Sequence, residues 1–211
     1  MLELNLLRHG QTDFSRENRF CGSIDPPLNE VGLRMADAFG AAHSGGAWTA
    51  IYCSPRQRAL QTADALARRV GLTPIVDDGL REIAYGEWES MRHDEVKSQW
   101  PEAYAYWAAD TASRGTPGGE TAFQVAARAA PVLERIRHRH ADGRILIVSH
   151  KATIRILVCA LLGMDVRLFR DRIAQPVAAV TRFEIKERTP MLALLGDVSH
   201  LPADLRDIEG T

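Results

Sequence analysis

An arginine and a histidine stand side by side where the first predicted strand ends. Arg8 and His9 directly follow a predicted strand that contains the alternating leucines of residues 2–6 and runs to Leu7, and Gly10 then breaks the strand. Open α/β sheets bind their ligands at the carboxyl ends of their strands. A guanidinium is a permanently charged fork that suits phosphate oxygens, and an imidazole can act as a nucleophile or carry a proton near neutral pH. The pair is therefore a candidate site for phosphate chemistry.

Two further residues of the same types follow later predicted strands. Arg58 lies in the first turn of a helix that comes after the short apolar strand 50–53, and His150 lies between the apolar run 144–149 and the next helix. Because such strand ends meet at one edge of a sheet, we expect two arginines and two histidines to converge there. Helix N-termini at this edge add backbone N–H donors and positive dipole. The pattern predicts an anion site without a metal and with a candidate nucleophile.

Strands and helices alternate along the chain in the way needed to build such an edge. Residues 29–43, with Asn29 as N-cap, predict a helix because apolar side chains recur there at helical spacing. The other predicted helices are 56–70, 120–140 and 152–162, and the predicted strands are 2–7, 50–53, 74–77, 144–149, 178–184 and 191–195. We therefore expect a three-layer α/β/α fold with a mostly parallel, doubly wound sheet of about six strands.

The segment before the long helix has a different character. Residues 93–107 predict two short helices divided by Pro101. We interpret residues of about 90–117 as a small helical cap insert within a single domain of residues 1–211. Its aromatic side chains either cover the pocket or form the core of the insert; they are Trp88, Trp100, Tyr104 and Trp107.

Composition sets bounds on the class of protein. The 211 residues are 45% hydrophobic and 25% charged with a formal net charge of -1, which is ordinary for a globular protein and gives no global field toward nucleic acid or an anionic membrane. No apolar run approaches the ~20 residues of a membrane helix, and no signal peptide is predicted. The three cysteines are scattered without the spacing of a metal site, which favours reduced thiols and a cytoplasmic location.

Five spaced blocks of sequence carry a family resemblance. In chain order they are LLRHGQT at 6–12, SPRQRALQTA at 54–63, LREIAYGEWE at 80–89, PGGET at 117–121 and VSH at 148–150. Over about residues 2–200 they resemble the histidine phosphatase superfamily, the metal-independent relatives of phosphoglycerate mutase. The resemblance implies an α/β sheet flanked by helices and a mechanism through phosphohistidine, with no cofactor.

The resemblance also implies a role for each candidate residue. His9 matches the nucleophile, Arg8, Arg58 and His150 match the phosphate pocket, and Glu82 matches the general acid. Two arginines and a protonated His150 would hold the oxygens of a phosphoryl group before reaction. His9 must attack as neutral imidazole, so its other nitrogen should donate to a carbonyl. Glu82 must be protonated to release the leaving group, and it would then activate the water that hydrolyses phospho-His9.

Each role competes with a structural one. Arg58 could equally be a solvated helix residue, and His150 could be a capping or packed histidine at its strand-to-helix junction. Glu82 competes with Glu87 and Glu89, which are close in sequence and which we interpret as surface charges. The agreement of five blocks favours the catalytic interpretation in each case.

Several expected substrate contacts depart from the family pattern. Ser15 stands where the family usually has an Asn that contacts phosphate, and its shorter hydroxyl can still donate. Cys21 replaces a common Gln before Gly22, and we place both residues at the substrate. Lys151 replaces a small Gly after the second histidine. It either adds a cation for a second acidic group of the substrate or points to solvent.

The leading functional prediction is a phosphomonoesterase for a small phosphorylated metabolite, such as phosphoserine, phosphoglycerate or a sugar phosphate. A phosphotransferase of the phosphoglycerate mutase type shares the pocket, but such mutases usually carry a longer, arginine-bearing insert than this chain has. The third alternative is a non-catalytic protein that binds phosphate esters. We expect a small phosphate ester as the partner, no nucleic acid and no membrane, and a homodimer would be compatible with an exposed sheet edge.

Overall fold

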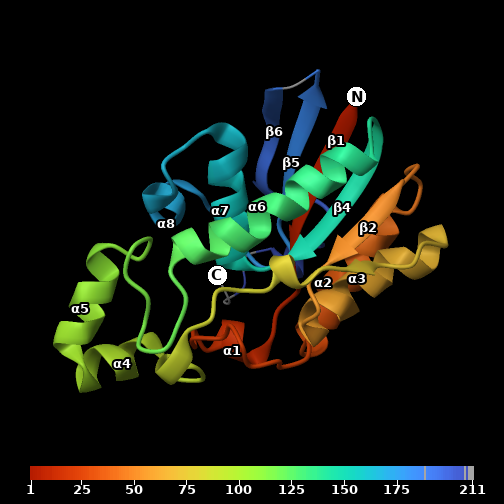
Figure 1. Ribbon diagram of the computed structural model, residues 1–211. Coiled ribbons are helices and arrows are strands. Elements are labelled where there is room, and N and C mark those ends of the chain that lie inside the picture. Colours follow the sequence, from red (N-terminus) through yellow and green to blue (C-terminus); the bar gives the residue numbers. More distant parts are fainter. Residues whose placement is uncertain (188, 207, 209–211) are drawn as a thin grey trace.

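A six-stranded sheet with helices on both faces organises the molecule (Figure 1). The computed structural model describes residues 1–187, 189–206 and 208. The strands are β1 (Leu2–Arg8), β2 (Ala50–Cys53), β3 (Ile75–Val76), β4 (Gly143–Ser149), β5 (Val180–Lys186) and β6 (Thr189–Asp197). They lie in the order β3-β2-β4-β1-β5-β6, with β3, β2, β4 and β1 parallel and β5 antiparallel to both of its neighbours. The expected fold class, a mostly parallel sheet of about six strands, is confirmed.

The interior strand β1 is buried on both of its faces. Leu2, Leu4 and Leu6 pack in the core that includes α6 and α7, whereas Leu7 packs in the core that includes α2 and α3. Successive side chains of a strand point to opposite faces, so one short strand contributes to both cores. The carboxyl end of β1 is thereby fixed between two layers of helices, and Arg8 is its last residue.

The helices cover the two faces in pairs. Their bounds are α1 (Asp13–Arg16), α2 (Glu30–His43), α3 (Gln57–Val70), α4 (His93–Gln99), α5 (Pro101–Ala109), α6 (Ala122–Arg139), α7 (Lys151–Leu162) and α8 (Phe169–Arg172). The Asn29 side chain caps α2 as predicted, and α3 ends at Gly71 in the left-handed conformation, with φ of 70°. The one-turn helices α1 and α8 were not predicted, because four residues are too few to show a helical period.

Helices α4 and α5 lie apart from the sheet (Figure 1). Pro101 begins the second of them, so the predicted division of the segment is confirmed. Phe20, Trp88 and Trp107 form a buried cluster with Val96 of α4. Both interpretations therefore hold in part: Trp88 and Trp107 lie in the core of the insert, and Trp107 also lines the cavity described below together with Tyr104. The 44% exposed Trp100 stays outside this core.

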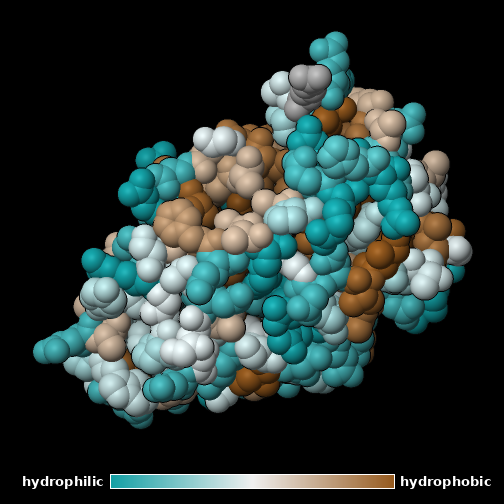
Figure 2. Space-filling model, in the orientation of Figure 1, coloured by the Kyte–Doolittle hydropathy of each residue, from teal (hydrophilic) through white to brown (hydrophobic). Residues whose placement is uncertain are grey.

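The surface carries hydrophobic residues in separate patches. Figure 2 shows one face, on which hydrophilic areas divide the hydrophobic ones. The large exposed apolar side chains come from distant elements, among them Leu33 of α2, Val76 of β3, Phe123 of α6 and Met191 of β6. Among the described residues, none of the helices has the length and apolar character needed to cross a membrane.

Candidate active site

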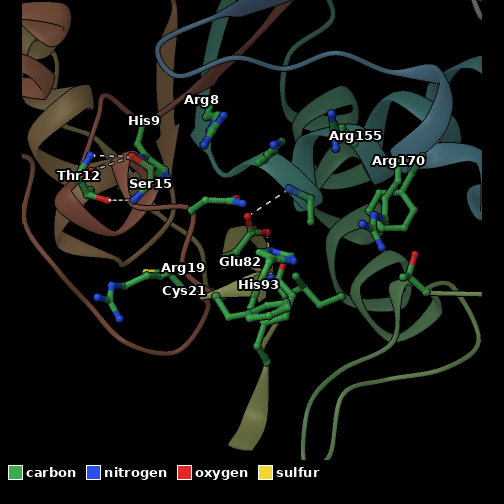
Figure 3. A pocket seen from close by; sticks show the side chains of 18 of the residues that line it. Arg8, His9, Thr12, Ser15, Arg19, Cys21, Glu82, His93, Arg155 and Arg170 are labelled. Atoms are coloured by element: carbon green, nitrogen blue, oxygen red, sulfur yellow. Dashed lines mark hydrogen bonds between the residues drawn. The ribbon is translucent and has the colours of Figure 1, made fainter. Parts of the chain in front are cut away.

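A cavity of about 370 Å³ lies at the carboxyl end of β1. Arg8, His9 and Glu82 form part of its wall (Figure 3). Arg58 also lines the cavity. Figure 3 places Thr12 and Ser15 to one side of this group and Arg155 and Arg170 to the other. The strand ends that were predicted to converge at one edge of the sheet therefore contribute residues to one cavity.

The backbone of Arg8 and His9 is held from both sides. The Arg8 amide donates to the carbonyl of Ala179 at 3.1 Å, and the His9 amide donates to the carbonyl of Ser149 at 3.0 Å. The Arg8 guanidinium donates from Nη1 to the Gln175 carbonyl at 2.8 Å. Burial lowers the pKa of Arg8 to about 10, so the guanidinium keeps its charge at neutral pH.

His9 is held in one tautomer. Its Nδ1 lies 2.7 Å from the Gly10 carbonyl oxygen, and because a carbonyl only accepts, Nδ1 carries the proton and Nε2 keeps its lone pair. Burial, followed by the charges of Arg58 and Arg8, holds the pKa of His9 well below its usual range. The expected neutral imidazole with a carbonyl partner is confirmed. Such a side chain can attack an electrophilic phosphorus.

The second histidine lies beneath the cavity wall. His150 is fully buried, and its ring centroid is 5.1 Å from that of His9. Arg58 donates from Nε to His150 Nδ1 at 3.2 Å, so Nδ1 has no proton and Nε2 donates to the Ser54 hydroxyl at 2.7 Å. Burial and then the Arg58 charge hold the pKa of His150 well below its usual range. The expectation of a protonated His150 is wrong for this structure, because its nearest charged neighbour is a cation.

Arg58 ties the site to the loop that follows α1. Its Nη1 donates to the carbonyl of Ile24 at 2.9 Å, and its Nη2 lies 3.4 Å from the carbonyls of both Cys21 and Gly22. The side chain is only 1% exposed. The alternative that Arg58 is a solvated helix residue is therefore wrong. A planar fork with several fixed acceptors cannot swing away from the site.

Glu89 organises the same loop and is not a surface charge. Its carboxylate accepts backbone hydrogen bonds from Gly22 at 3.0 Å, from Ser23 at 2.8 Å and from Tyr85 at 2.9 Å. The interpretation of Glu87 as exposed is confirmed, whereas that of Glu89 is wrong. The sequence alone cannot distinguish Glu87 from Glu89. Which loop N–H groups need an acceptor depends on the backbone conformation, and the spacing of side-chain types does not show it.

Gly22 does not line the cavity. Its amide is used by Glu89, and a Cβ at this position would lie 1.9 Å from the carbonyl oxygen of Ile83. The loop can pass the Glu82–Ile83 segment only where a side chain is missing. The expected contact between Gly22 and substrate is therefore replaced by a structural role, which brings the loop and the Glu82 segment together.

Ser15 and Cys21 do line the cavity, but neither presents a charged or free donor to it. The Ser15 hydroxyl donates to the Thr12 carbonyl and accepts from the Thr12 amide, both at 2.9 Å, in the capping box of α1. Burial raises the pKa of the Cys21 thiol to about 11, so it is neutral. The Ser15 hydroxyl could contact phosphate only by giving up its bond to the Thr12 carbonyl.

Glu82 is buried against the N-terminus of α7. Its Oε1 accepts from the amides of Ile83 and Thr153 at 2.9 and 3.1 Å and from the Thr153 hydroxyl at 3.2 Å. Its Oε2 accepts a single hydrogen bond, from the Ala152 amide at 3.1 Å. The carboxyl is therefore fixed in orientation, and Oε2 accepts fewer hydrogen bonds than Oε1.

Arg128 of α6 holds the segment that carries Glu82. It donates to the carbonyls of Gly79, Arg81 and Glu82 at 2.9, 2.8 and 3.0 Å, and it pairs with Glu120 at 2.9 Å. Arg128 was not among the residues predicted for the site. Its partner Glu120 belongs to the PGGET block and could be noticed there. Arg128 lies eight residues later and belongs to none of the five blocks.

Three cations form a wall away from Ser15. Lys151 and Arg155 stand four residues apart on α7, and Arg170 belongs to α8, where its guanidinium lies 4.6 Å from the centre of the Trp107 ring. Burial, then Arg8 and Arg155, lower the pKa of Lys151 to about 7. Lys151 therefore faces the cavity and not open solvent. Arg155 and Arg170 were missed, although the four-residue spacing from Lys151 predicts that Arg155 shares its helix face.

Among the residues that the structure describes, no group of three or more His, Cys, Asp or Glu side chains is arranged to hold a metal ion. The charges that surround the cavity are those of arginine, lysine and glutamate side chains. An anion is the ligand that this arrangement can hold.

Comparisons with known proteins agree with this chemistry. The model of the histidine phosphatase superfamily (branch 1) matches residues 4–198, so the chain belongs to this family. Phosphoserine phosphatase 1 of Hydrogenobacter thermophilus is 31% identical over 201 residues, 95% of each protein. Glucosyl-3-phosphoglycerate phosphatase of Mycolicibacterium vanbaalenii is 34% identical over 171 residues, which are 77% of this chain and 75% of the relative.

A solved structure supports the same assignment. YhfR of Bacillus stearothermophilus superimposes with a TM-score of 0.87 at 32% identity, over 95% of this chain and 99% of that one. Family membership together with relatives that are named as phosphatases identifies the chain as a phosphomonoesterase.

Proposed function

We propose that the chain hydrolyses a small phosphorylated metabolite through a phosphohistidine intermediate on His9. The supporting observation is the hydrogen bond from His9 Nδ1 to the Gly10 carbonyl, which leaves the Nε2 lone pair on a neutral ring beside Arg8 and Arg58. Phosphoserine, phosphoglycerate and sugar-phosphate-like esters are the candidate substrates. Two named relatives, a phosphoserine phosphatase and a glucosyl-3-phosphoglycerate phosphatase, act on esters of this size class.

The first chemical step transfers the phosphoryl group to the protein. His9 Nε2 attacks phosphorus, a P–N bond forms, and the bond from phosphorus to the ester oxygen breaks. Arg8 and Arg58 hold the equatorial oxygens, whose negative charge must be balanced in the transition state. His150 acts through its bond to Arg58 Nε, which keeps the guanidinium plane turned toward the loop and the cavity.

Glu82 moves the proton in both steps. Carried on Oε2, the proton passes to the leaving oxygen as the ester bond breaks. The resulting carboxylate then takes a proton from water, whose oxygen attacks the phosphorus of phospho-His9 and restores the neutral imidazole. The four hydrogen bonds to the Glu82 carboxyl keep it aligned during this exchange.

The test is phosphate release from a panel of phosphomonoesters in the presence of EDTA, for the unaltered protein and for His9→Ala. We expect release by the unaltered protein and a loss of about 10⁴-fold or more in the variant, since the covalent route is removed. Conversion of 3-phosphoglycerate to its 2-isomer with a bisphosphate primer, without hydrolysis, would establish the mutase alternative. Binding of esters with neither reaction, and with no acid-labile phosphohistidine, would establish a binding protein.

A further inference from the structure

The cations around the cavity are balanced differently on its two sides. Arg19, on the side of Cys21, pairs with Glu17 at 2.7 Å. Among the described residues, no carboxylate accepts a hydrogen bond from Lys151, Arg155 or Arg170. Within the described part of the chain, these three cations of one cavity wall therefore make no ion pair, and Glu82 and Asp171 act on them only through longer-range attraction.

These cations are partly buried, so the absence of an ion-pair partner lowers the stability of the folded protein. The Arg155 Nε atom is buried and has no hydrogen-bond partner. Arg8, Arg155 and Arg170 repel the ammonium of Lys151, and Arg170 repels Arg155, while Glu82 attracts both of these cations. Partly buried charges of one sign destabilise a fold unless an opposite charge is present. The repulsion is removed when an anion binds among them.

The substrate phosphate does not fill this place in the proposed mechanism. The phosphoryl group must lie within reach of His9 Nε2, between Arg8 and Arg58. In Figure 3, Arg155 and Arg170 lie beyond Arg8, on the side away from Thr12 and Ser15. The Trp107 ring fixes the Arg170 guanidinium at 4.6 Å, so this cation is positioned before any ligand arrives.

We infer that Lys151, Arg155 and Arg170 form a subsite for a second anionic group of the substrate, a carboxylate or a second phosphate. The inference rests on the proposed function for the position of the first phosphate. It narrows the substrate class to phosphate esters whose alcohol part carries an acidic group, and it excludes neutral alcohol esters as the preferred substrates. The pair of arginines provides forked donors, and Lys151 provides a point charge between the two ends of the pocket.

The test compares two esters that differ in one group. 3-Phosphoglycerate carries a carboxylate where glycerol 3-phosphate carries a hydroxymethyl group. We expect the unaltered protein to have a kcat/KM at least about 10-fold higher for 3-phosphoglycerate, because charge-assisted hydrogen bonds contribute ~1.5–3 kcal/mol each. Propane-1,3-diol bisphosphate distinguishes a carboxylate from a second phosphate as the group that binds the subsite. A higher kcat/KM for this ester than for 3-phosphoglycerate assigns the subsite to a second phosphate.

The variants Arg155→Gln and Arg170→Gln test the assignment to these residues. Each should lower the ratio of the two kcat/KM values by about 10-fold or more. Because both esters report on the same enzyme sample, the ratio does not depend on how much of the variant is folded. Arg172→Gln is the matched control, since Arg172 lies on the same short helix but is exposed and outside the cavity wall. Equal losses for both esters in the Arg155 and Arg170 variants would overturn the inference.

A binding measurement separates this inference from the proposed function. In His9→Ala, titration calorimetry with 3-phosphoglycerate and glycerol 3-phosphate reports binding without turnover. Tighter binding of 3-phosphoglycerate that is lost in Arg155→Gln on the same background supports the subsite even if no ester is hydrolysed. Equal affinity for the two esters, or binding of neither, overturns the subsite even if hydrolysis is observed.

Discussion

The two ends of the pocket differ in what holds their charged groups. At the end near His9, backbone carbonyls and neighbouring side chains fix each group: Arg58 has three carbonyls and His150, and Glu82 has four donors. At the other end, Arg155 and Arg170 make no hydrogen bond or ion pair to a carboxylate of the described residues. The difference separates a preorganised part, which suits a chemical step common to all esters, from a part that gains its partner only from a ligand.

The largest expected effect tests the acid at the preorganised end. Glu82→Gln should lower kcat for glycerol 3-phosphate by about 10²–10⁴-fold, because an alkoxide leaves poorly without a proton. The loss should be much smaller for 4-nitrophenyl phosphate, whose leaving group needs little protonation. Steady-state kinetics with both esters provide the measurement. An equal loss for the two would mean that Glu82 acts only on the structure.

The next effect distinguishes the two ends directly. Arg58→Gln should lower kcat/KM by about 100–1000-fold, because it removes preorganised donors to the phosphoryl oxygens. This loss should be the same, within about threefold, for 3-phosphoglycerate and glycerol 3-phosphate. Circular dichroism of the variant checks that the loop at Cys21 and Gly22 has not unfolded the protein. A loss confined to the carboxylate ester would break the proposed division between the ends.

A smaller effect concerns the loop behind the preorganised end. Glu89→Ala leaves the amides of Gly22, Ser23 and Tyr85 without their acceptor, and should lower the free energy of unfolding by about 1–3 kcal/mol. Urea denaturation measures this change. Glu87→Ala is the matched control, since the exposed Glu87 side chain should change stability by less than ~0.5 kcal/mol. Equal stability of the two variants would remove the role assigned to Glu89.

The smallest effect concerns the other end of the pocket, formed by Lys151, Arg155 and Arg170, which we call the unpartnered end. Burial lowers the pKa of Lys151 from 10.5 to about 7, so the unfolded chain binds more protons than the folded one between these values and wild-type stability rises with pH there. Without ligand, Lys151→Met should therefore melt about 2–4 °C higher at pH 6, the shift expected for ~1 kcal/mol, with the gain shrinking toward pH 10. Arg8, Arg155 and Arg170 face Lys151 and repel its ammonium, and Glu82 attracts it. Thermal melts of both proteins from pH 6 to 10 measure this difference. A gain in melting temperature that does not change with pH would show that it does not come from the lowered pKa of Lys151.

The preorganised end was largely predictable from the sequence, and the unpartnered end was not. Arg8, His9 and Arg58 follow strands or open helices, and strand ends of a parallel sheet have a known place. Arg155 and Arg170 sit within helices, where an arginine is usually a solvated side chain, and only the tertiary packing turns them toward the cavity. The protonation of His150 failed for a related reason: its neighbours, Ser54 and Arg58, come from another strand end.

Loop contacts explain the remaining differences. Gly22 was expected at the substrate because it follows Cys21, yet its missing side chain serves the close approach to Ile83. Ser15 lines the cavity, but its hydroxyl belongs to the capping box with Thr12. The residue types were compatible with both roles, and backbone geometry, which a single sequence does not reveal, selected one of them.

The position of β1 also constrains when the protein can become active during its synthesis. Leu2 pairs with Gly143 on one side and with Ile185 on the other, so β1 lacks both of its neighbours in the sheet until β4 and β5 have been synthesised. Pairings of such long sequence separation are formed late and slowly. Arg8 also waits for the carbonyls of Gln175 and Ala179. A nascent or prematurely terminated chain therefore cannot hold its nucleophile in place, and phosphatase activity in a translation reaction should appear only with chains that extend beyond β5.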